Sequence, residues 1–416
     1  MPVNFGIKTA SLIEACKRLK TVSKEGASNY AEIAMLEHRD GAIVLSARNF
    51  DLAIEFVVSS CEDAFEPAFF NIKDAAAIAA AAKKAKQDCV KLTVSALDEA
   101  QREVVLSALP GVDAKYVSDN DHEVYSYMFA MKPDSAVFEL PADFTQVMKE
   151  ANPFASRDEA RKNISGVHFS KSGDMLVITA TNGHALYTRR LSGMDDVVFE
   201  YADRSRGDAI VPIALCDLYD RMSLNGAVTL MRTGSCEGFD SKKAVSFTQS
   251  CDDYTVTVSG RLVDGLYPDF TQVIPNGGVD GGRRHSAFFC TARFDMALDL
   301  FKVIGSGQQQ FPVRFNCSPA RIDMSGVNGS RKIEVELLIE DGTLADLMPE
   351  EYDKLLGKDA NFGAFQANVK YLEIARNVFK DAEELSLEFG TSLEPLVFWS
   401  LERDVACVVM PIRLQQ

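Results

Sequence analysis

The sequence lacks the features that mark several large protein classes. Its nine cysteines are odd in number and contain no C-x-x-C pair, which predicts reduced core residues rather than a disulfide framework or a metal site. The least polar stretch, residues 75–82, is too short to cross a bilayer and runs into two lysines. The first eight residues have no apolar core, so we expect no signal peptide, no membrane association and a cytoplasmic protein.

Motifs that carry catalysis are also missing. The sequence contains no G-x-x-x-x-G-K-[ST] loop, and its five histidines show neither H-E-x-x-H nor H-x-x-x-H spacing. His184 has no serine or cysteine nucleophile motif beside it, and Gly265 and residues 281–282 are interpreted as turns. We therefore predict no catalytic residue, no metal and no cofactor.

Positive charge is scarce. The 416 residues contain 44 Lys or Arg against 60 Asp or Glu, a net charge of −16, and the 47% hydrophobic content is that of an ordinary globular protein. This length predicts two or three domains. Because non-specific DNA binding depends on cations that neutralise phosphates, the net charge argues against a generally basic DNA binder. It does not exclude a protein that gathers its cations on one surface.

One pattern occurs three times along the chain. Residues 41–56, 174–191 and 321–340 each alternate between apolar and polar positions on both sides of an asparagine, namely Asn49, Asn182 and Asn328, which predicts hairpins. Helical periodicity precedes each hairpin, in residues 10–24, 142–155 and 292–305. It also follows each hairpin, in residues 72–86, 211–223 and 367–380, before further alternating segments.

The repeat predicts an α+β fold of three similar domains, 1–133, 134–280 and 281–416, with boundaries where turn and polar residues accumulate. Residues 192–207 and 341–363 are interpreted as surface insertions, the second with a short helix near residues 348–359.

Charge is distributed unevenly between the predicted elements. The segments 7–24, 73–88, 140–155, 211–223, 291–306 and 367–381 contain 16 Lys or Arg and 11 Asp or Glu, a net of +5, which leaves −21 for the rest of the chain. One interpretation is that lysine and arginine simply occupy solvated helix faces. The other is that the helices together form a lining for a polyanion.

Residues 180–186, 261–275 and 408–414 carry a resemblance that extends over essentially the whole chain. The sequence resembles the bacterial DNA polymerase III beta subunits, the sliding clamps. This resemblance implies three domains of the DNA clamp fold, each with two helices packed on antiparallel sheets, and two chains closed head to tail into a ring. It implies a non-catalytic processivity factor that encircles double-stranded DNA without reading its sequence and tethers a DNA polymerase during replication.

The resemblance also implies a pocket between the second and third domains that binds a short peptide of the polymerase, the clamp loader and other partners. The positions carried over are Ile164, Thr181, Gly183, His184, Leu186, Pro268, Val273, Asn368, Tyr371, Leu393, Pro395, Val408, Val409, Met410, Pro411, Ile412 and Arg413. Three positions depart from the family pattern: Asn182 replaces an aspartate, Ala185 an arginine and Gln272 a basic residue.

The remaining implied positions concern DNA and the homodimer. The DNA-facing set is Lys17, Arg18, Lys20, Lys24, Lys83, Lys84, Lys86, Lys149 and Lys162. Val104 of one chain is expected to face Val303 and Ile304 of the other across the dimer interface. The alternative is a monomeric, clamp-like scaffold that binds replication or repair proteins without forming a ring, and mass in solution separates the two.

Overall fold

The computed structural model describes residues 2–23, 32–99, 101–119, 129–133, 137–194, 197, 199, 207–236, 242–274, 285–308, 310–343, 345–346, 348, 350–351 and 363–413. The chain divides into two compact units. Unit 1 contains Met1–Met148 and Met194–Val263, and unit 2 contains Lys149–Gly193 and Asp264–Gln416. The predicted domain boundaries after residues 133 and 280 fall beside or within segments outside the described residues, and they stay predictions.

The predicted threefold repeat is present as a repeated order of elements, in which each copy runs β-α-β-β-β-β-α-β-β-β. The first copy comprises β1 (Val3–Lys8), α1 (Thr9–Ser23), β2 (Ile33–Arg39), β3 (Ala42–Arg48), β4 (Leu52–Ser60), β5 (Ala68–Asn71), α2 (Ile72–Lys84), β6 (Cys89–Ala96), β7 (Gln101–Leu109) and β8 (Val112–Asp119). The second comprises β10 (Phe138–Leu140), α4 (Phe144–Ala151), β11 (Gly166–Ser172), β12 (Met175–Thr181), β13 (Ala185–Leu191), β14 (Ala209–Pro212), α5 (Ile213–Met222), β15 (Thr229–Cys236), β16 (Lys243–Ser250) and β17 (Thr255–Arg261). The third comprises β18 (His285–Cys290), α6 (Thr291–Ile304), β19 (Pro312–Ser318), β20 (Arg321–Asn328), β21 (Arg331–Leu338), β22 (Ala364–Asn368), α8 (Val369–Val378), β23 (Glu384–Phe389), β24 (Leu396–Trp399) and β25 (Val405–Val409). Strand β9 (Met131–Pro133) and the 3₁₀ turns η1 (Asn152–Phe154), η2 (Lys162–Ile164) and η3 (Phe270–Val273) lie outside this order.

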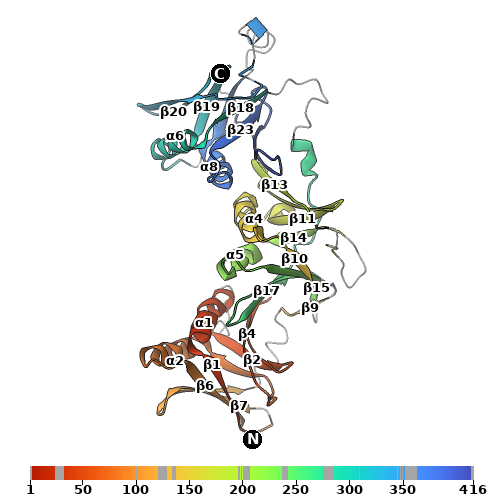
Figure 1. The fold of residues 1–416 in the computed structure, drawn as a ribbon, viewed down its shortest axis with the longest axis vertical. Coiled ribbons are helices and arrows are strands. Elements are labelled where there is room, and N and C mark those ends of the chain that lie inside the picture. Colours follow the sequence, from red (N-terminus) through yellow and green to blue (C-terminus); the bar gives the residue numbers. More distant parts are fainter. Residues whose placement is uncertain are drawn as a thin grey trace. The chain divides into compact units, whose positions relative to one another are not determined.

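Unit 1 contains two antiparallel sheets. One has the order β1-β6-β7-β8, and the other has the order β10-β15-β16-β17-β4-β3-β2-β5, with β9 paired to β15. The larger sheet joins two copies of the repeat, because β17 of the second copy pairs with β4 of the first from Thr255 opposite Val57 to Gly260 opposite Leu52. Helices α1 and α2 pack side by side in this unit (Figure 1).

In unit 2, likewise, a sheet joins strands of the second copy to strands of the third. One sheet runs β11-β12-β13-β25-β24-β23-β18 and the other β21-β20-β19-β22, all antiparallel. Strand β13 of the second copy pairs with β25 of the third, with Leu186 opposite Val408. Helices α6 and α8 pack against each other (Figure 1). At the far edge of the first sheet, the start of the predicted insertion pairs with β18 through Phe288 and Asp341, which covers an otherwise open strand edge.

Local sequence explains where the helices begin and end. Asn71 and Asn368 cap α2 and α8 by accepting hydrogen bonds from backbone N–H groups of the first helical turn, which satisfies donors that have no partner within a helix. The pattern over residues 142–155 predicts one helix, but α4 ends at Ala151 and Pro153 lies in the 3₁₀ turn that follows. Proline has no backbone N–H to continue the α-helical bonds.

The predicted burial of the cysteines is only partly correct. Five of the nine thiols are buried, and burial raises the pKa of the thiols of Cys317 and Cys407 well above the usual value. Cys89 and Cys251 are exposed instead: Cys89 is the first residue of β6, and Cys251 lies in the turn between β16 and β17. Most of the predicted insertion at residues 192–207, and of the helix predicted near residues 348–359, falls outside the described residues.

Candidate functional site

The turn between β12 and β13 gathers three of the predicted pocket residues. Thr181 Oγ1 donates to the carbonyl of Ala185 at 2.8 Å and accepts from the backbone N–H of Gly183 at 3.1 Å. Asn182 Oδ1 accepts from the backbone N–H groups of His184 and Ala185 at 2.9 and 3.0 Å. Gly183 has a φ of 84°, which favours glycine because other side chains are strained there. The turn therefore holds its backbone in one conformation and presents the exposed His184.

Asn182 is one of the three departures from the family pattern. Its side-chain oxygen makes the two hydrogen bonds that a carboxylate oxygen would make at this position, so the turn keeps its form while the negative charge is absent. Asn49 plays the same part in the first copy, where its Oδ1 accepts from the N–H groups of Asp51 and Leu52 at 2.9 and 2.8 Å. Asn328 differs, because its Nδ2 donates to the carbonyl of Ile304 at 2.6 Å.

Arg161 is a member of this site that the sequence reasoning missed. Its guanidinium donates to the carbonyl of Asn182 at 2.9 Å and to Oδ2 of Asp158 at 2.9 Å. A Cβ atom placed on Gly183 would lie 2.9 Å from Arg161 Nη1, so glycine at this position also leaves room for the arginine. In the sequence, Arg161 is marked only by its position three residues before Ile164, which does not distinguish it from other basic residues.

An aromatic pair joins the turn to helix α8. The rings of His184 and Tyr371 stack with centroids 5.3 Å apart and planes 16° from parallel. Asn368, which is buried, fixes the first turn of α8 by accepting from the N–H of Lys370 at 3.1 Å, and this places Tyr371 beside the histidine. Burial raises the pKa of Tyr371.

Unit 2 also contains an apolar cluster, which includes Leu186, two positions after His184. Leu186, Val397, Ala406 and Val408 are buried together, and Phe270, Ile274 and Trp399 pack against them while remaining partly exposed. The pairing of β13 with β25 and of β25 with β24 brings the five strand residues of the cluster onto one face of the sheet, and Phe270 and Ile274 come from η3 and the residue after it. Leu186 and Val408 are predicted from the sequence, whereas the other five residues are not. The exposed parts of Phe270, Ile274 and Trp399 give this part of unit 2 an apolar surface.

The last described residues of the chain close one side of the site. Beyond β25, the N–H of Met410 donates to the carbonyl of His184 at 2.8 Å, and the N–H of Ile412 donates to the carbonyl of Gln366 at 2.7 Å. Met410, Pro411 and Ile412 are half-buried and Arg413 is exposed. Val409 has no exposed surface because it points to the opposite face of β25 from Val408; this predicted pocket residue is therefore a core residue.

The loop that carries Pro268 and Val273 is held by local interactions. Asp269 Oδ1 accepts from the N–H and Oγ1 of Thr271 at 3.0 and 2.6 Å, and its Oδ2 accepts from Gln272 Nε2 at 3.1 Å. These hydrogen bonds lower the pKa of Asp269. Gln272, the third departure, is thus used within the loop, whereas Pro268 and Val273 are exposed beside the half-buried Phe270.

The other predicted pocket residues are less closely associated. Ile164 is buried at the end of η2, and its carbonyl accepts from the N–H of Ser156 at 3.0 Å. Leu393 is 71% exposed and Pro395 is half-buried, both between β23 and β24 and outside the apolar cluster described above. His184, Leu186, Tyr371 and Val408 therefore lie together, whereas Leu393 and Pro395 of the third-domain loop do not join them.

Most of the predicted DNA-facing cations are exposed. Lys17, Lys83, Lys84 and Lys86 lie on or just after α1 and α2 in unit 1, and Lys149 and Lys162 are exposed in unit 2. Lys20 is half-buried, and Lys24 lies outside the described residues. Arg18, which was predicted to face DNA, is largely buried instead. Its side chain is 15% exposed, and its guanidinium donates to the carbonyl of Met222 at 2.8 Å. It therefore ties α1 to the end of α5 instead of facing solvent.

Two of the three predicted dimer residues are buried. Val104 has no exposed surface because it lies on the inward face of β7, which packs against α2, and Ile304 is only 5% exposed. Val303 is 65% exposed. It shares one face of α6 with Met296 and Leu300, which are 60% and 47% exposed and lie seven and three positions earlier. The exposed apolar surface is therefore on α6, not at Val104.

Ion pairs join the two helices of the third copy. Arg376 of α8 lies 3.5 Å from Asp295 and 3.6 Å from Asp299 of α6, and Lys302 of α6 lies 2.9 Å from Glu373 of α8. Burial raises the pKa of Asp295. Lys302 and Arg376 are therefore paired between the two helices, whereas Arg293 of α6 and Lys370 of α8 are exposed.

Comparison with known proteins agrees with this architecture. No family model matches the sequence. The beta sliding clamp of Bacillus subtilis (strain 168) is 21% identical over 417 residues, which cover 99% of this chain and all of that protein. The crystal structure of the Bacillus subtilis DNA polymerase sliding clamp matches with a TM-score of 0.74 and 16% identity, over the whole of both chains. The chain has the fold of the bacterial sliding clamps.

Other sliding-clamp structures match equally well. A DNA polymerase III beta subunit of Pseudomonas aeruginosa matches with a TM-score of 0.72 and 16% identity over the whole of both chains. A putative DNA polymerase III beta subunit of Eubacterium rectale matches with a TM-score of 0.74 and 14% identity over 99% of this chain and all of that one. The resemblance inferred from the sequence is thus confirmed, as is the α+β clamp fold. Within the described residues, no helix has the length and apolarity to span a bilayer.

Proposed function

We propose that this chain is a DNA sliding clamp, a processivity factor whose two copies form a ring around duplex DNA and tether a replicative polymerase. The observation that carries the proposal is the match of the whole chain to sliding-clamp structures, with a TM-score of 0.74. A ring holds DNA by topology, so it requires neither a bond-making residue nor readout of bases. The proposed protein is non-catalytic and acts in the cytoplasm, where the chromosome is.

The partner site that we propose is the arrangement around His184, Tyr371 and the apolar cluster of Leu186 and Val408. The partly exposed Phe270, Ile274 and Trp399 surround that cluster and supply apolar surface to a leucine or phenylalanine side chain. Burial of each such side chain contributes about 1.5–3 kcal/mol. A binding energy of this size suits partners that exchange, such as a polymerase, a clamp loader and repair proteins.

The DNA surface that we propose consists of the exposed lysines of α1 and α2, with Lys149 and Lys162. The acidic remainder of the chain repels phosphates, so weak attraction at one lining keeps the duplex centred without a tight grip. Arg18 is excluded from this surface because it is bonded within unit 1.

For ring closure, we propose that unpaired sheet edges of the two copies pair with each other and that the exposed face of α6 lies beside them. In the described sheets, β8 ends the order β1-β6-β7-β8, and β21 ends the order β21-β20-β19-β22. Edge strands with open backbone groups favour pairing with another chain. Pairing β8 of one copy with β21 of the other would cover both edges, and Met296, Leu300 and Val303 supply apolar surface beside the junction.

Two measurements test this function. A clamp loaded onto circular DNA should stay bound in high salt and be released when the circle is cut, because only topology holds it. Mass in solution should be close to twice 45.7 kDa. A clean monomer at micromolar concentration would favour the scaffold alternative, and equal retention on circular and linear DNA would refute the topological tether.

A further inference from the structure

A second candidate binding site lies in unit 1, on the face of the larger sheet that points away from α5. A Cβ atom on Gly260 of β17 would lie 3.1 Å from Leu215 of α5, so the side of β17 that includes Gly260 faces that helix. Because side chains alternate along a strand, Ser259 and Thr257 face the other way. They line a cavity of about 620 Å³, within the size range of ligand sites.

The floor of this cavity is a row of small side chains across neighbouring strands. Arg232 of β15 pairs with Ser246, Ser246 with Ser259, Ser259 with Ala53, and Ala53 with Arg48. Two serines and an alanine between two arginines leave a trough, because larger side chains would fill it. This trough is lined by residues of both the first and the second copy of the repeat.

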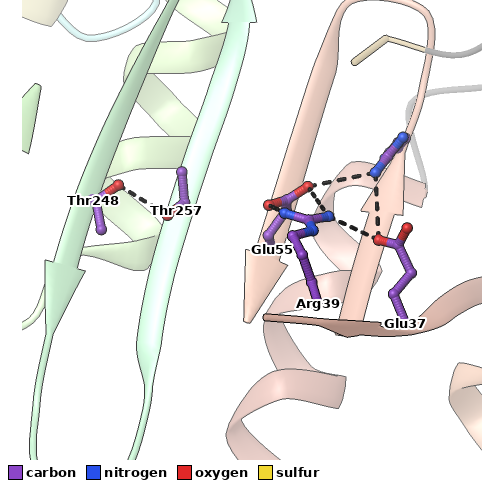
Figure 2. Close-up of polar contacts among 6 residues, drawn as sticks. Glu37, Arg39, Glu55, Thr248 and Thr257 are labelled. Carbon is purple, nitrogen blue, oxygen red and sulfur yellow. Dashed lines mark hydrogen bonds and ion pairs between the residues drawn. The ribbon is translucent and has the colours of Figure 1, made fainter. Parts of the chain in front are cut away.

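Two hydroxyl groups in the floor have no bonding partner in the described parts of the chain. Ser246 and Ser259 are each 7% exposed, and the side chain of neither makes a hydrogen bond with a described residue. The next row differs, because the Oγ1 atoms of Thr248 and Thr257 bond to each other at 2.9 Å (Figure 2). The serine oxygens are not sealed from the trough, so the two serines are donors that a ligand there can use.

The two ends of the trough differ in charge. At one end, Arg39 lies 2.9 Å from both Glu37 and Glu55, and Arg48 lies 3.4 Å from Glu55, so the charges balance (Figure 2). At the other end, Arg232 is exposed and makes no ion pair with any residue that the structure describes. The trough therefore offers one uncompensated guanidinium beside hydroxyl donors, an arrangement that suits a carboxylate.

An apolar wall lies next to this arginine. Leu230 of β15, Met131 of β9 and Val137 before β10 line the same cavity, and Val137 is 41% exposed. A free inorganic anion gains nothing from such a wall. A peptide with an apolar side chain beside an aspartate or glutamate uses the wall, the arginine and the serines together.

We propose that this trough binds a short peptide segment of a partner protein in which a carboxylate side chain is adjacent to an apolar one. The carboxylate pairs with Arg232 and accepts from Ser246 or Ser259, and the apolar side chain packs on Leu230 and Met131. This site shares no residue with the partner site around His184 and does not depend on it.

The experiment uses the full-length protein labelled with ¹³C at the methionine methyl groups. The probe is the peptide acetyl-Gly-Leu-Asp-Gly-amide, with acetyl-Gly-Leu-Asn-Gly-amide as its uncharged match and inorganic phosphate as a third ligand. We expect the aspartate peptide to shift the Met131 methyl resonance in NMR spectra. Arg232→Gln should weaken binding by about tenfold or more, the loss expected for a charge-assisted hydrogen bond.

The control variants distinguish binding in the trough from binding elsewhere on the protein. Ser246→Ala should weaken binding less than Arg232→Gln does, and Tyr371→Ala in unit 2 should leave it unchanged. Equal binding of the asparagine peptide, equal binding to Arg232→Gln, or no shift of Met131 at about 5 mM peptide would overturn the proposal. Phosphate binding as tightly as the aspartate peptide would also overturn it, because the apolar wall would then contribute nothing.

Discussion

At the scale of the residue, His184 and Tyr371 make the most specific contact of the candidate partner site. Their rings stack 5.3 Å apart, and an aromatic pair contributes about 0.5–1.5 kcal/mol beyond the area it buries. We expect His184→Ala to weaken binding of a fluorescent peptide with a leucine-phenylalanine end by about two- to tenfold, measured by fluorescence polarisation. Tyr371→Ala should have a similar effect.

The control for this prediction is Asp174→Ala, in the exposed turn between β11 and β12, which should bind like the unmodified chain. Because His184 and Tyr371 act as a pair, the double variant should lose less than the sum of the two single losses. Strictly additive losses, or no loss in either single variant, would contradict the role given to the stack.

Some residues of the site can be predicted from the sequence, and others cannot. The spacing of Asn182, Gly183 and His184 predicts a hairpin turn, and the structure contains it, because turn chemistry is local. Val104 was assigned to an interface but is buried, since alternation along β7 gives two faces and only the position of α2 decides which one is inward. Arg161 was missed because its bond to the carbonyl of Asn182 joins residues 21 positions apart.

At the scale of the element, the segment after β25 decides whether the partner site is complete. Strand β25 ends at Val409, and the following residues are held to the fold by the bonds of Met410 to His184 and of Ile412 to Gln366. We expect deletion of residues 410–416 to abolish partner binding, because the wall formed by Met410, Pro411 and Ile412 is lost. The dimer should persist, since β8, β21 and α6 are untouched.

Peptide binding by fluorescence polarisation and mass by light scattering check this prediction together. Deletion of residues 414–416 alone is the matched control, because it keeps both bonds. If polymerase stimulation survives the longer deletion, the site is wrongly assigned; if the dimer is also lost, the segment has a role in folding that these two bonds do not explain.

The elements themselves were predictable to different degrees. The six helical segments and three hairpins follow from periodicity, because each long amphipathic face repeats its signal several times. Strand β9 and the 3₁₀ turns contain three or four residues each, too few for a period to be recognised. The pairings of β4 with β17 and of β13 with β25 join residues far apart in the chain, so no local pattern contains them.

At the scale of the whole molecule, the sequence predicts a charge distribution more securely than individual contacts. The net of +5 on the helical segments within a chain of −16 requires only composition. Which cations are available requires the fold, since Arg18 bonds to Met222 and Arg376 to the aspartates of α6. The remaining exposed lysines near the end of α2 are the sharpest test of the proposed lining.

We expect the double charge reversal Lys83→Glu with Lys84→Glu to weaken binding of the clamp to short linear duplexes and to reduce its salt dependence. If each lysine neutralises one phosphate, the slope of log affinity against log salt should fall by about 0.9 for each lysine removed. The matched control is Lys91→Glu with Lys242→Glu. Lys91 is exposed on β6, where its neighbours Val90 and Leu92 are buried on the side of α2, and Lys242 is exposed just before β16. The control pair changes the net charge equally but lies away from the proposed lining.

Retention on closed circular DNA should persist in both double variants, because topology rather than attraction holds the ring. Equal loss of short-duplex binding in the two variants would mean that net charge alone governs DNA association, and that α1 and α2 form no lining.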